Sequence, residues 1–154
     1  MDGEALNQAV IALEPAAAKR EKADRPAVQV PPEKLAALAL ALRDEPALAF
    51  DLLLDHTAID WIAEERFELV YVLYSTVHGH YLMVTTSVPR GAPVVPTVSA
   101  VWPIAHWQER EVFDLMGIQY DDHPDLRRLF LEDEWQGHPL RKDYKDDHML
   151  GLPK

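Results

Sequence analysis

Three carboxylates and one guanidinium occur within a short stretch of the chain, as Glu109, Arg110, Glu111 and Asp114. Carboxylates that lie close together raise one another's pKa, and pairs of acidic residues can then act as the acid and the base of a reaction. General acid–base catalysis is therefore one interpretation. It lacks support nearby, because the sequence shows no candidate nucleophile or substrate pocket beside these side chains.

One helix is expected to position these charges. It spans residues 102–117, with Trp102-Pro103 at its start and Gly117 after its last turn. Residues four apart lie on the same side of a helix, so Arg110 and Asp114 are expected to pair on its surface. Such a pair contributes only about 0.3–0.5 kcal/mol when it is exposed.

Glu111 is the carboxylate that we expect to be buried, because it falls within or beside the apolar stripe of this helix. The stripe includes Trp107, Val112 and Leu115. A buried carboxylate is costly unless it is paired with a cation or with backbone donors. The candidate cations are Arg127, Arg128 and Arg141, which all follow the helix. The simpler alternative is a helix with a solvated charged face and a single buried ion pair.

A metal-dependent hydrolase is the main enzymatic alternative, because the chain contains 7 histidines. His106 and Glu109 have same-face helical spacing, and His78 and His80 could point to one face of a strand. Against a metal site, the sequence contains no His-x-x-x-His and no His-Glu-x-x-His motif. Isolated histidines more often serve as surface or hydrogen-bonding residues.

The composition argues against several other classes of protein. The chain has 26 acidic and 15 basic residues and a net charge of −11, which disfavours binding to nucleic acids or anionic lipids. It has no cysteine, and this excludes disulfides, thiolate catalysis and cysteine-ligated iron–sulfur clusters. Its 6 glycines are scattered, so we expect no phosphate-binding loop for NADH or a flavin.

No segment is expected to enter a membrane. The N-terminus lacks the basic region that precedes the apolar core of a secretory signal. The apolar runs are far shorter than the roughly 20 residues that cross a bilayer. If the protein works at a membrane, another subunit must therefore hold it there.

The pattern of the chain predicts an α+β fold, in which a mixed or antiparallel sheet packs with helices and is followed by an extended C-terminal tail. The expected strands are residues 27–30, 49–54, 57–61, 67–75 and 80–87, a second helix spans residues 33–43, and residues 88–97 form a loop. We divide the 154 residues into a loosely attached leader helix and linker (1–26), an α+β sandwich domain (27–117) and the tail (118–154).

Three blocks of sequence, in this order and spacing, carry a resemblance to a known family. The first is Glu109-Arg110-Glu111 with Asp114 and Gly117, the second is His123-Pro124-Asp125-Leu126-Arg127-Arg128, and the third is Gly137-His138-Pro139-Leu140-Arg141-Lys142-Asp143-Tyr144. They closely resemble the signature of the C subunit, also called the 30 kDa-type subunit, of respiratory NADH–quinone oxidoreductase (complex I). Weaker similarity extends the match over residues 28–144. Lys145 departs from the family pattern, which usually has a proline there.

This resemblance implies a cofactor-free, hydrophilic structural subunit in the peripheral arm of the complex, on the cytoplasmic face of the bacterial inner membrane. Its expected partners are the D subunit, which forms the quinone site, and the nearby B subunit. FMN, iron–sulfur clusters and quinone are expected in other subunits, and the three blocks are expected to serve structure and docking, with no catalytic or metal-binding residue. The family also includes related membrane-bound hydrogenases and ferredoxin-linked complexes, and the signature does not separate them.

Overall fold

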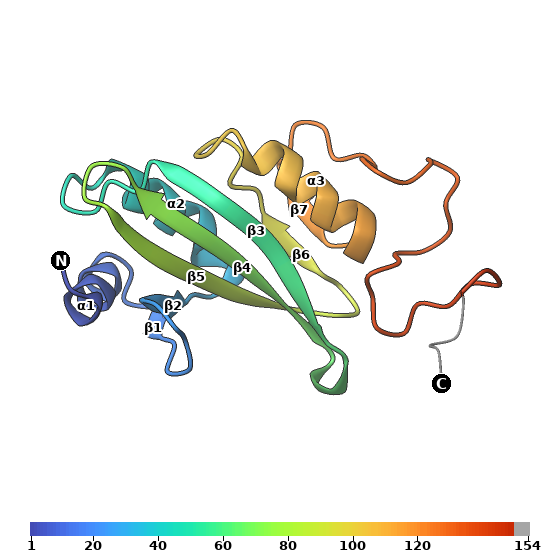
Figure 1. The fold of residues 1–154 in the computed structure, drawn as a ribbon, viewed down its shortest axis with the longest axis horizontal. Coiled ribbons are helices and arrows are strands. Elements are labelled where there is room, and N and C mark those ends of the chain that lie inside the picture. Colours follow the sequence, from blue (N-terminus) through green and yellow to red (C-terminus); the bar gives the residue numbers. More distant parts are fainter. Residues whose placement is uncertain (150–154) are drawn as a thin grey trace.

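The computed structural model describes residues 1–149 and shows helices packed on a five-stranded sheet, with a two-stranded sheet beside it (Figure 1). In chain order the elements are α1 (Gly3–Leu13), β1 (Ala18–Lys19), β2 (Ala27–Gln29), the 3-10 helix η1 (Pro32–Lys34), α2 (Leu35–Asp44), β3 (Leu52–Trp61), the 3-10 helix η2 (Ile62–Glu64), β4 (Arg66–Ser75), β5 (His80–Pro89), β6 (Val94–Pro96), α3 (Ala105–Met116) and β7 (Gln119–Asp121). The predicted α+β fold class is confirmed. Residues 150–154 of the expected tail lie outside the described residues.

The five-stranded sheet is mixed and has the order β1-β2-β5-β4-β3. β4 pairs antiparallel with both β3 and β5, whereas β2 joins β5 in parallel. The side chains of β4 that face the core are Phe67, Leu69, Tyr71 and Leu73, each at most 1% exposed. Val70 and Val72, on the opposite face, are only half-buried. The expectation that this strand is buried on both sides is therefore correct for one side only.

The predicted pair of strands at 49–54 and 57–61 is wrong, because β3 is a single strand from Leu52 to Trp61. Its register with β4 shifts between Leu53 and Asp55, which marks a bulge. A bulge takes up one extra residue without ending the pairing, so the strand continues across the gap between the predicted segments. After the bulge, His56 and Asp60 are both buried.

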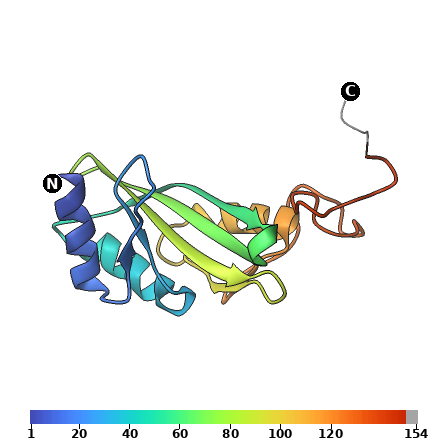
Figure 2. The same cartoon turned by 90° about the horizontal axis from the view of Figure 1, so that it is seen from below.

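The N-terminal helix is more firmly attached than the sequence suggested. Leu6 and Val10 lie four residues apart on one side of α1, and they are 1% and 0% exposed within the hydrophobic core. Figure 2 shows α1 beside α2 at one end of the sheet. Lys19 of β1 also pairs with Glu4 of α1, with 2.6 Å between Nζ and Oε2. The prediction of a loose leader is therefore wrong for α1, because its apolar stripe is long enough to join the core.

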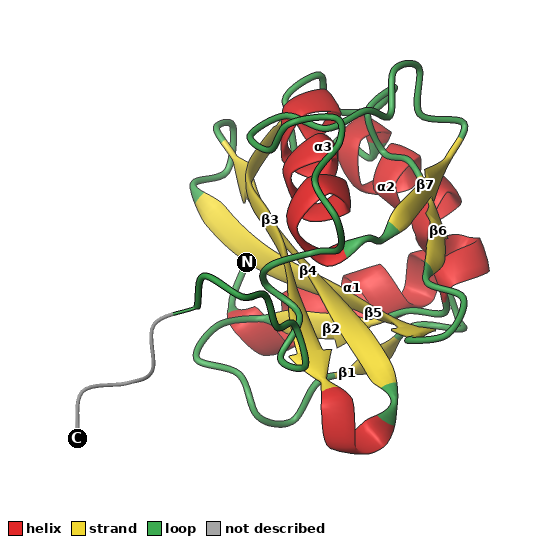
Figure 3. Cartoon of the chain, turned by 90° about the vertical axis from the view of Figure 1, so that its right-hand side faces the viewer, coloured by secondary structure: helices red, strands yellow, loops and turns green. Residues whose placement is uncertain are grey.

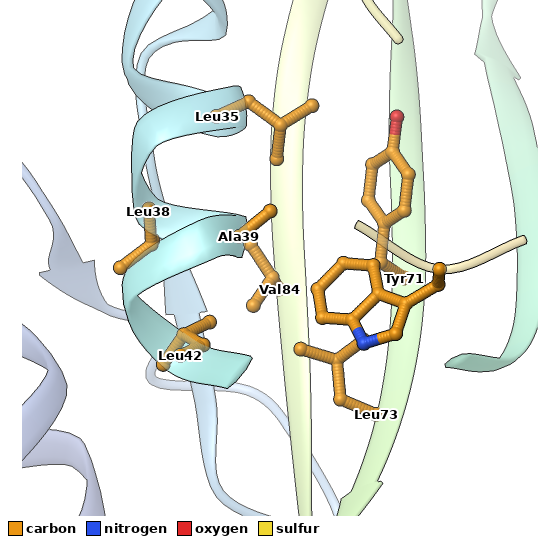
Figure 4. Close-up of a pocket in the computed structure, with 8 residues that line it drawn as sticks. Leu35, Leu38, Ala39, Leu42, Tyr71, Leu73 and Val84 are labelled. Atoms are coloured by element: carbon orange, nitrogen blue, oxygen red, sulfur yellow. The ribbon is translucent and has the colours of Figure 1, made fainter. Parts of the chain in front are cut away.

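The helix predicted for residues 33–43 is confirmed as η1 followed by α2, and it covers one face of the sheet (Figure 1). A small void of about 10 Å³ remains between them (Figure 4). Its lining consists of Leu35, Leu38, Ala39, Leu42, Tyr71, Leu73, Val84 and Trp102. A cavity of this size could hold at most one water, and apolar voids usually stay dry. The void is a packing gap and too small for a substrate.

The region around α3 differs from the prediction in two respects. The helix begins at Ala105 and not at Trp102, and the segment before it is not entirely a loop. Residues 88–97 are not entirely a loop, because β5 continues to Pro89 and β6 pairs in parallel with β7. Gly117 ends α3 with a φ of 73°, as predicted. The core continues beyond this glycine, since Ile118 and Tyr120 are 0% and 3% exposed.

After β7 the chain forms no helix or strand as far as residue 149. Figures 1 and 3 show this part of the tail passing beside α3 and then leaving the domain. Within the described residues, no helix is both long enough and apolar enough to span a membrane.

Candidate functional site

Asp114 on α3 binds the tail through both oxygens of its carboxylate. Its Oδ2 accepts the backbone N–H groups of Leu129, Phe130 and Leu131 at 3.1, 2.7 and 3.0 Å, and its Oδ1 accepts from Arg128 Nη1 at 2.9 Å. Burial by itself raises the pKa of Asp114, but these hydrogen bonds outweigh it, so the pKa lies below the usual value. The ionised carboxylate therefore fits this part of the tail.

Arg110 also binds the tail, through backbone carbonyls. Its Nε donates to the carbonyl of Arg127 at 3.1 Å and its Nη2 to that of Arg128 at 3.0 Å. The guanidinium lies 5.1 Å from the ring centroid of Trp107, which covers it. The predicted surface pair between Arg110 and Asp114 is therefore wrong, because each side chain uses its charge on the tail.

The buried carboxylate of the helix is Glu109, whereas Glu111 is exposed. The prediction for Glu111 is wrong because the buried side of α3 is rotated from the expected stripe. That side carries Ala105, Glu109, Val112 and Met116, at helical spacing. Glu109 Oε1 accepts the Val98 N–H at 2.8 Å, and its Oε2 accepts from Thr97 Oγ1 at 2.5 Å.

The end of α3 touches the third sequence block. Arg141 Nε donates to the carbonyl of Met116 at 2.7 Å, and His138 Nδ1 lies 2.9 Å from the carbonyl of Asp114. These side chains come so close that a Cβ on Gly117 would lie 2.5 Å from His138 Cδ2 and 2.7 Å from Arg141 Nη2. A glycine is therefore required here both by the positive φ and by the contact.

A second attachment joins the tail to the end of β3. Asp60, 3% exposed, accepts Arg90 Nε and Nη2 at 2.7 and 2.8 Å and the Lys142 N–H at 2.9 Å. Arg90 Nη2 also donates to Asp143 Oδ1 at 2.7 Å. The hydrogen bonds from Arg90 hold the pKa of Asp60 below its usual range. Sequence analysis missed Asp60 and Arg90. One signal could have pointed to Asp60. It lies two residues after Ala58 in a predicted strand, and side chains two apart in a strand share one face.

The second sequence block begins with a turn around His123 and Pro124. His123 Nε2 lies 3.0 Å from the carbonyl of His106, and its Nδ1 accepts the Asp125 N–H at 3.0 Å. Arg127 pairs with Asp125 at 3.0 Å, and this pair is exposed. Pro124 is exposed as well.

Two residues of the third sequence block, Gly137 and Pro139, remain to be placed. The carbonyl of Gly137 accepts from Arg128 Nη2 at 3.1 Å, and Pro139 is half-buried.

Among residues 1–149, no group of three or more His, Cys, Asp or Glu side chains is placed to hold a metal ion. His78 and His80 instead lie within hydrogen-bonding distance of the carbonyls of Pro46 and Leu48, at 2.8 and 3.0 Å.

Comparison with solved structures first relates this fold to a chain of a respiratory membrane complex. A chain of the membrane-bound sulfane sulfur reductase, an archaeal respiratory membrane complex, superposes with a TM-score of 0.80 at 28% identity, over 93% of this chain and 85% of that chain. The trypsin-resistant fragment of Nqo5 superposes with a TM-score of 0.64 at 28% identity, over 82% of this chain and 100% of the fragment.

More narrowly, the chain belongs to the 30 kDa subunit family of the respiratory-chain NADH dehydrogenase, whose model matches residues 28–148. It is 44% identical over 126 residues to the C subunit of NADH-quinone oxidoreductase from Moorella thermoacetica, covering 82% of this chain and 84% of the relative. It is 45% identical over 119 residues to the C subunit from Geobacter sulfurreducens, covering 76% and 72%. The predicted family is therefore confirmed.

Proposed function

We propose that this chain is a cofactor-free structural subunit in the peripheral arm of an NADH:quinone oxidoreductase, where it braces the quinone-site D subunit and lies near the B subunit. In this proposal FMN, the iron–sulfur clusters and quinone are bound by the other subunits. The complex couples NADH oxidation and quinone reduction to ion translocation, on the cytoplasmic face of the bacterial inner membrane. The relatives' common name, the C subunit of NADH-quinone oxidoreductase, supports the assignment to this complex.

The observation that carries the bracing role is a tail that is fixed at the backbone and apolar on the outside. Phe130 is 65% exposed, Leu140 58% and Trp135 39%. Phe130 is fixed at its own N–H by Asp114. Exposed apolar side chains that gather on one segment mark a surface for another protein.

The two attachments of the tail, at Asp114 and Asp60, also reduce the entropic cost of binding a partner. Hydrogen bonds to Asp114 and Asp60 fix both ends of the segment between Leu129 and Lys142 before any partner arrives. A segment that is already ordered loses less conformational entropy when it binds. The division that we propose is thus an α+β domain of residues 27–117, to which α1 and β7 contribute core residues, and a tail that wraps a partner.

A second candidate is the equivalent subunit of a membrane-bound hydrogenase or ferredoxin-linked complex. The similarity to a chain of the archaeal sulfane sulfur reductase favours keeping it, because that match covers 93% of this chain. Both candidates use the same tail. The proteins that co-purify with the intact chain distinguish them, because an NADH-oxidising flavoprotein supports the first and a hydrogenase large subunit the second.

Co-expression with the D subunit tests the bracing role. The double variant Phe130→Ser and Leu140→Ser should reduce the amount of D subunit that co-purifies by at least about tenfold, since truncation of a central apolar contact often costs about 2 kcal/mol or more. Val77→Ser is the matched control, because Val77 is 69% exposed at the turn between β4 and β5. Unchanged circular dichroism shows that the variants are folded. Equal retention of the D subunit by both variants would refute the proposed surface.

A further inference from the structure

Glu109 is a fully buried carboxyl group without a cationic partner among the described residues. The nearest basic side chain recorded beside it is His123, whose Nε2 lies 3.9 Å from Oε2. That ring nitrogen lies 3.0 Å from the carbonyl of His106, which can only accept, so it carries a hydrogen. Its other nitrogen accepts the Asp125 N–H, so the hydrogen bonds of His123 fit a neutral ring. An ionised Glu109 would therefore be a buried charge with no counter-ion.

Two hydroxyl groups connect this carboxyl group to the surface. Thr97 Oγ1 lies 2.5 Å from Glu109 Oε2 and 2.8 Å from Ser99 Oγ, and it also accepts the Ser99 N–H at 3.1 Å. Glu109 is 0% exposed, whereas Thr97 and Ser99 in the segment between β6 and α3 are both partly exposed. The contacts form one chain, from Ser99 through Thr97 to Glu109.

This chain can be fully hydrogen-bonded in either of two directions. A threonine hydroxyl has one hydrogen, so Thr97 cannot donate to Glu109 and to Ser99 at the same time. When Glu109 is protonated, it donates to Thr97 and Thr97 donates to Ser99. When Glu109 is ionised, Ser99 donates to Thr97 and Thr97 donates to Glu109. The heavy atoms can stay in place, and only the hydroxyl hydrogens change sides.

We propose that Glu109 is a buried proton-binding site that exchanges its proton with solvent through the hydroxyls of Thr97 and Ser99. On uptake, a proton from water passes to Ser99 Oγ, the Ser99 hydrogen passes to Thr97 Oγ1, and the Thr97 hydrogen passes to Glu109 Oε2. One proton is gained in total and no electrons move. Release runs the same steps in reverse.

The groups that face Glu109 from β4 and β7 are neutral tyrosines, which supply no positive charge for an ionised carboxylate. Tyr71 of β4 and Tyr120 of β7 are both buried. Burial is the main reason that the pKa of Tyr120 lies well above its usual value, and the nearby Tyr71 and Glu109 raise this pKa further. Arg110, next to Glu109 on α3, donates to the tail carbonyls. Burial raises the pKa of Glu109 to about 7, although the hydrogen bonds from Thr97 and Val98 oppose the shift.

Carbon-13 NMR of the Glu109 carboxyl group in the intact chain tests the site directly. The proposal predicts that this carboxyl titrates near neutral pH, whereas an exposed glutamate titrates near its ordinary value of 4.5. Glu109→Gln identifies the resonance by its loss. A Glu109 carboxyl that remains ionised down to its ordinary value would overturn the proposal. The titration itself is measured on the wild-type chain, and Glu109→Gln serves only to assign the resonance.

A matched pair of substitutions tests the route. Thr97→Ser keeps the hydroxyl, so the two forms of Glu109 should exchange rapidly and give one averaged resonance, as in the wild type. Thr97→Val removes the hydroxyl and a donor to the carboxylate. It should raise the midpoint of the titration and slow the exchange until the two forms give separate resonances. Identical titration and line shape in both variants would exclude the route through Thr97.

Linkage to folding gives an independent readout. Because the pKa of Glu109 is raised in the folded state, the wild type binds more protons folded than unfolded between pH 4.5 and about 7. The contribution of Glu109 to stability is complete below this window and is lost as pH rises through it, by up to about tenfold in the folding constant per pH unit. The folding constant of Glu109→Gln relative to the wild type should rise with pH over the same window. A ratio that is independent of pH would contradict a raised pKa.

Discussion

At the scale of single residues, the contacts of Asp114 explain why an aspartate is fully buried on α3. Its side chain is 0% exposed, and it accepts three backbone N–H groups and one guanidinium from the tail. Four charge-assisted hydrogen bonds offset the desolvation of the carboxylate. The same bonds order four consecutive tail residues, 128–131.

Replacement of Asp114 by alanine should therefore destabilise the protein strongly. We expect Asp114→Ala to lower the free energy of unfolding by about 3–5 kcal/mol, because it removes the acceptor of three N–H groups and the charged partner of Arg128. Glu111→Ala, three residues away on the same helix but exposed, should change it by less than about 0.5 kcal/mol. Denaturation in urea measures both. Equal effects would mean that the Asp114 hydrogen bonds do not stabilise the fold.

His56 is buried, and its pKa should lie well below that of an ordinary surface histidine. Its Nδ1 lies 3.0 Å from the carbonyl of Val70, its Nε2 lies 2.6 Å from the Tyr120 hydroxyl, and its ring stacks on Tyr71 at 4.1 Å. A carbonyl can only accept, so Nδ1 carries the hydrogen and Nε2 accepts from Tyr120. Burial lowers the pKa of His56 to about 4, against an ordinary value of 6.5.

The folded protein thus binds fewer protons at His56 than the unfolded chain between about pH 4 and 6.5, so this contribution to stability is lost as pH falls through that window. Nitrogen-15 NMR should show His56 neutral, with its hydrogen on Nδ1, throughout the neutral range. Titration near 6.5 would show that the ring is not sealed in the core. The slope has the opposite sign to that of Glu109, so the two partly cancel in the wild type.

At the scale of elements, the sequence predicted those whose signals are local. Local patterns predicted β4, β5 and the helix over residues 33–43, which corresponds to η1 and α2, and Gly117 predicted the end of α3. The pairing of β6 with β7 was missed, because each strand has only three residues and its partner lies on the far side of a helix. The choice of Glu111 over Glu109 failed for a similar reason. The rotation of a helix depends on what packs against it, and Trp107, 53% exposed, covers Arg110 rather than the core.

Gly117 connects the end of α3 to the tail, and its replacement tests that contact. Gly117→Ala should lower the free energy of unfolding by at least about 1 kcal/mol, because alanine is strained at a φ of 73° and its Cβ would meet His138 and Arg141. Gly91→Ala is the matched control, since nothing lies within 4 Å of a Cβ at Gly91 and its φ is not in the left-handed region. It should change stability by less than about 0.5 kcal/mol. Comparable losses in both variants would show that the contact at Gly117 is unimportant.

At the scale of the whole molecule, most charges of the three sequence blocks are paired within the chain, whereas Phe130, Trp135 and Leu140 of the tail are exposed. The sequence predicted a tail bound by α3 through arginines, and Arg128 and Arg141 do bind α3. It did not predict the second attachment at Asp60, because that contact joins residues 82 positions apart. The family could be predicted from the order of the blocks, whereas the surface that meets a partner required the exposure of each side chain.

Site-specific photo-cross-linking from position 130 in the assembled complex tests the central claim most directly. A photoreactive side chain in place of Phe130, which is 65% exposed, should cross-link to the quinone-site D subunit. The same group in place of Val77, which is 69% exposed at the turn between β4 and β5, should give far less of that product. The account is contradicted if position 130 cross-links to no other protein of the complex, or if the D subunit is captured equally well from position 77.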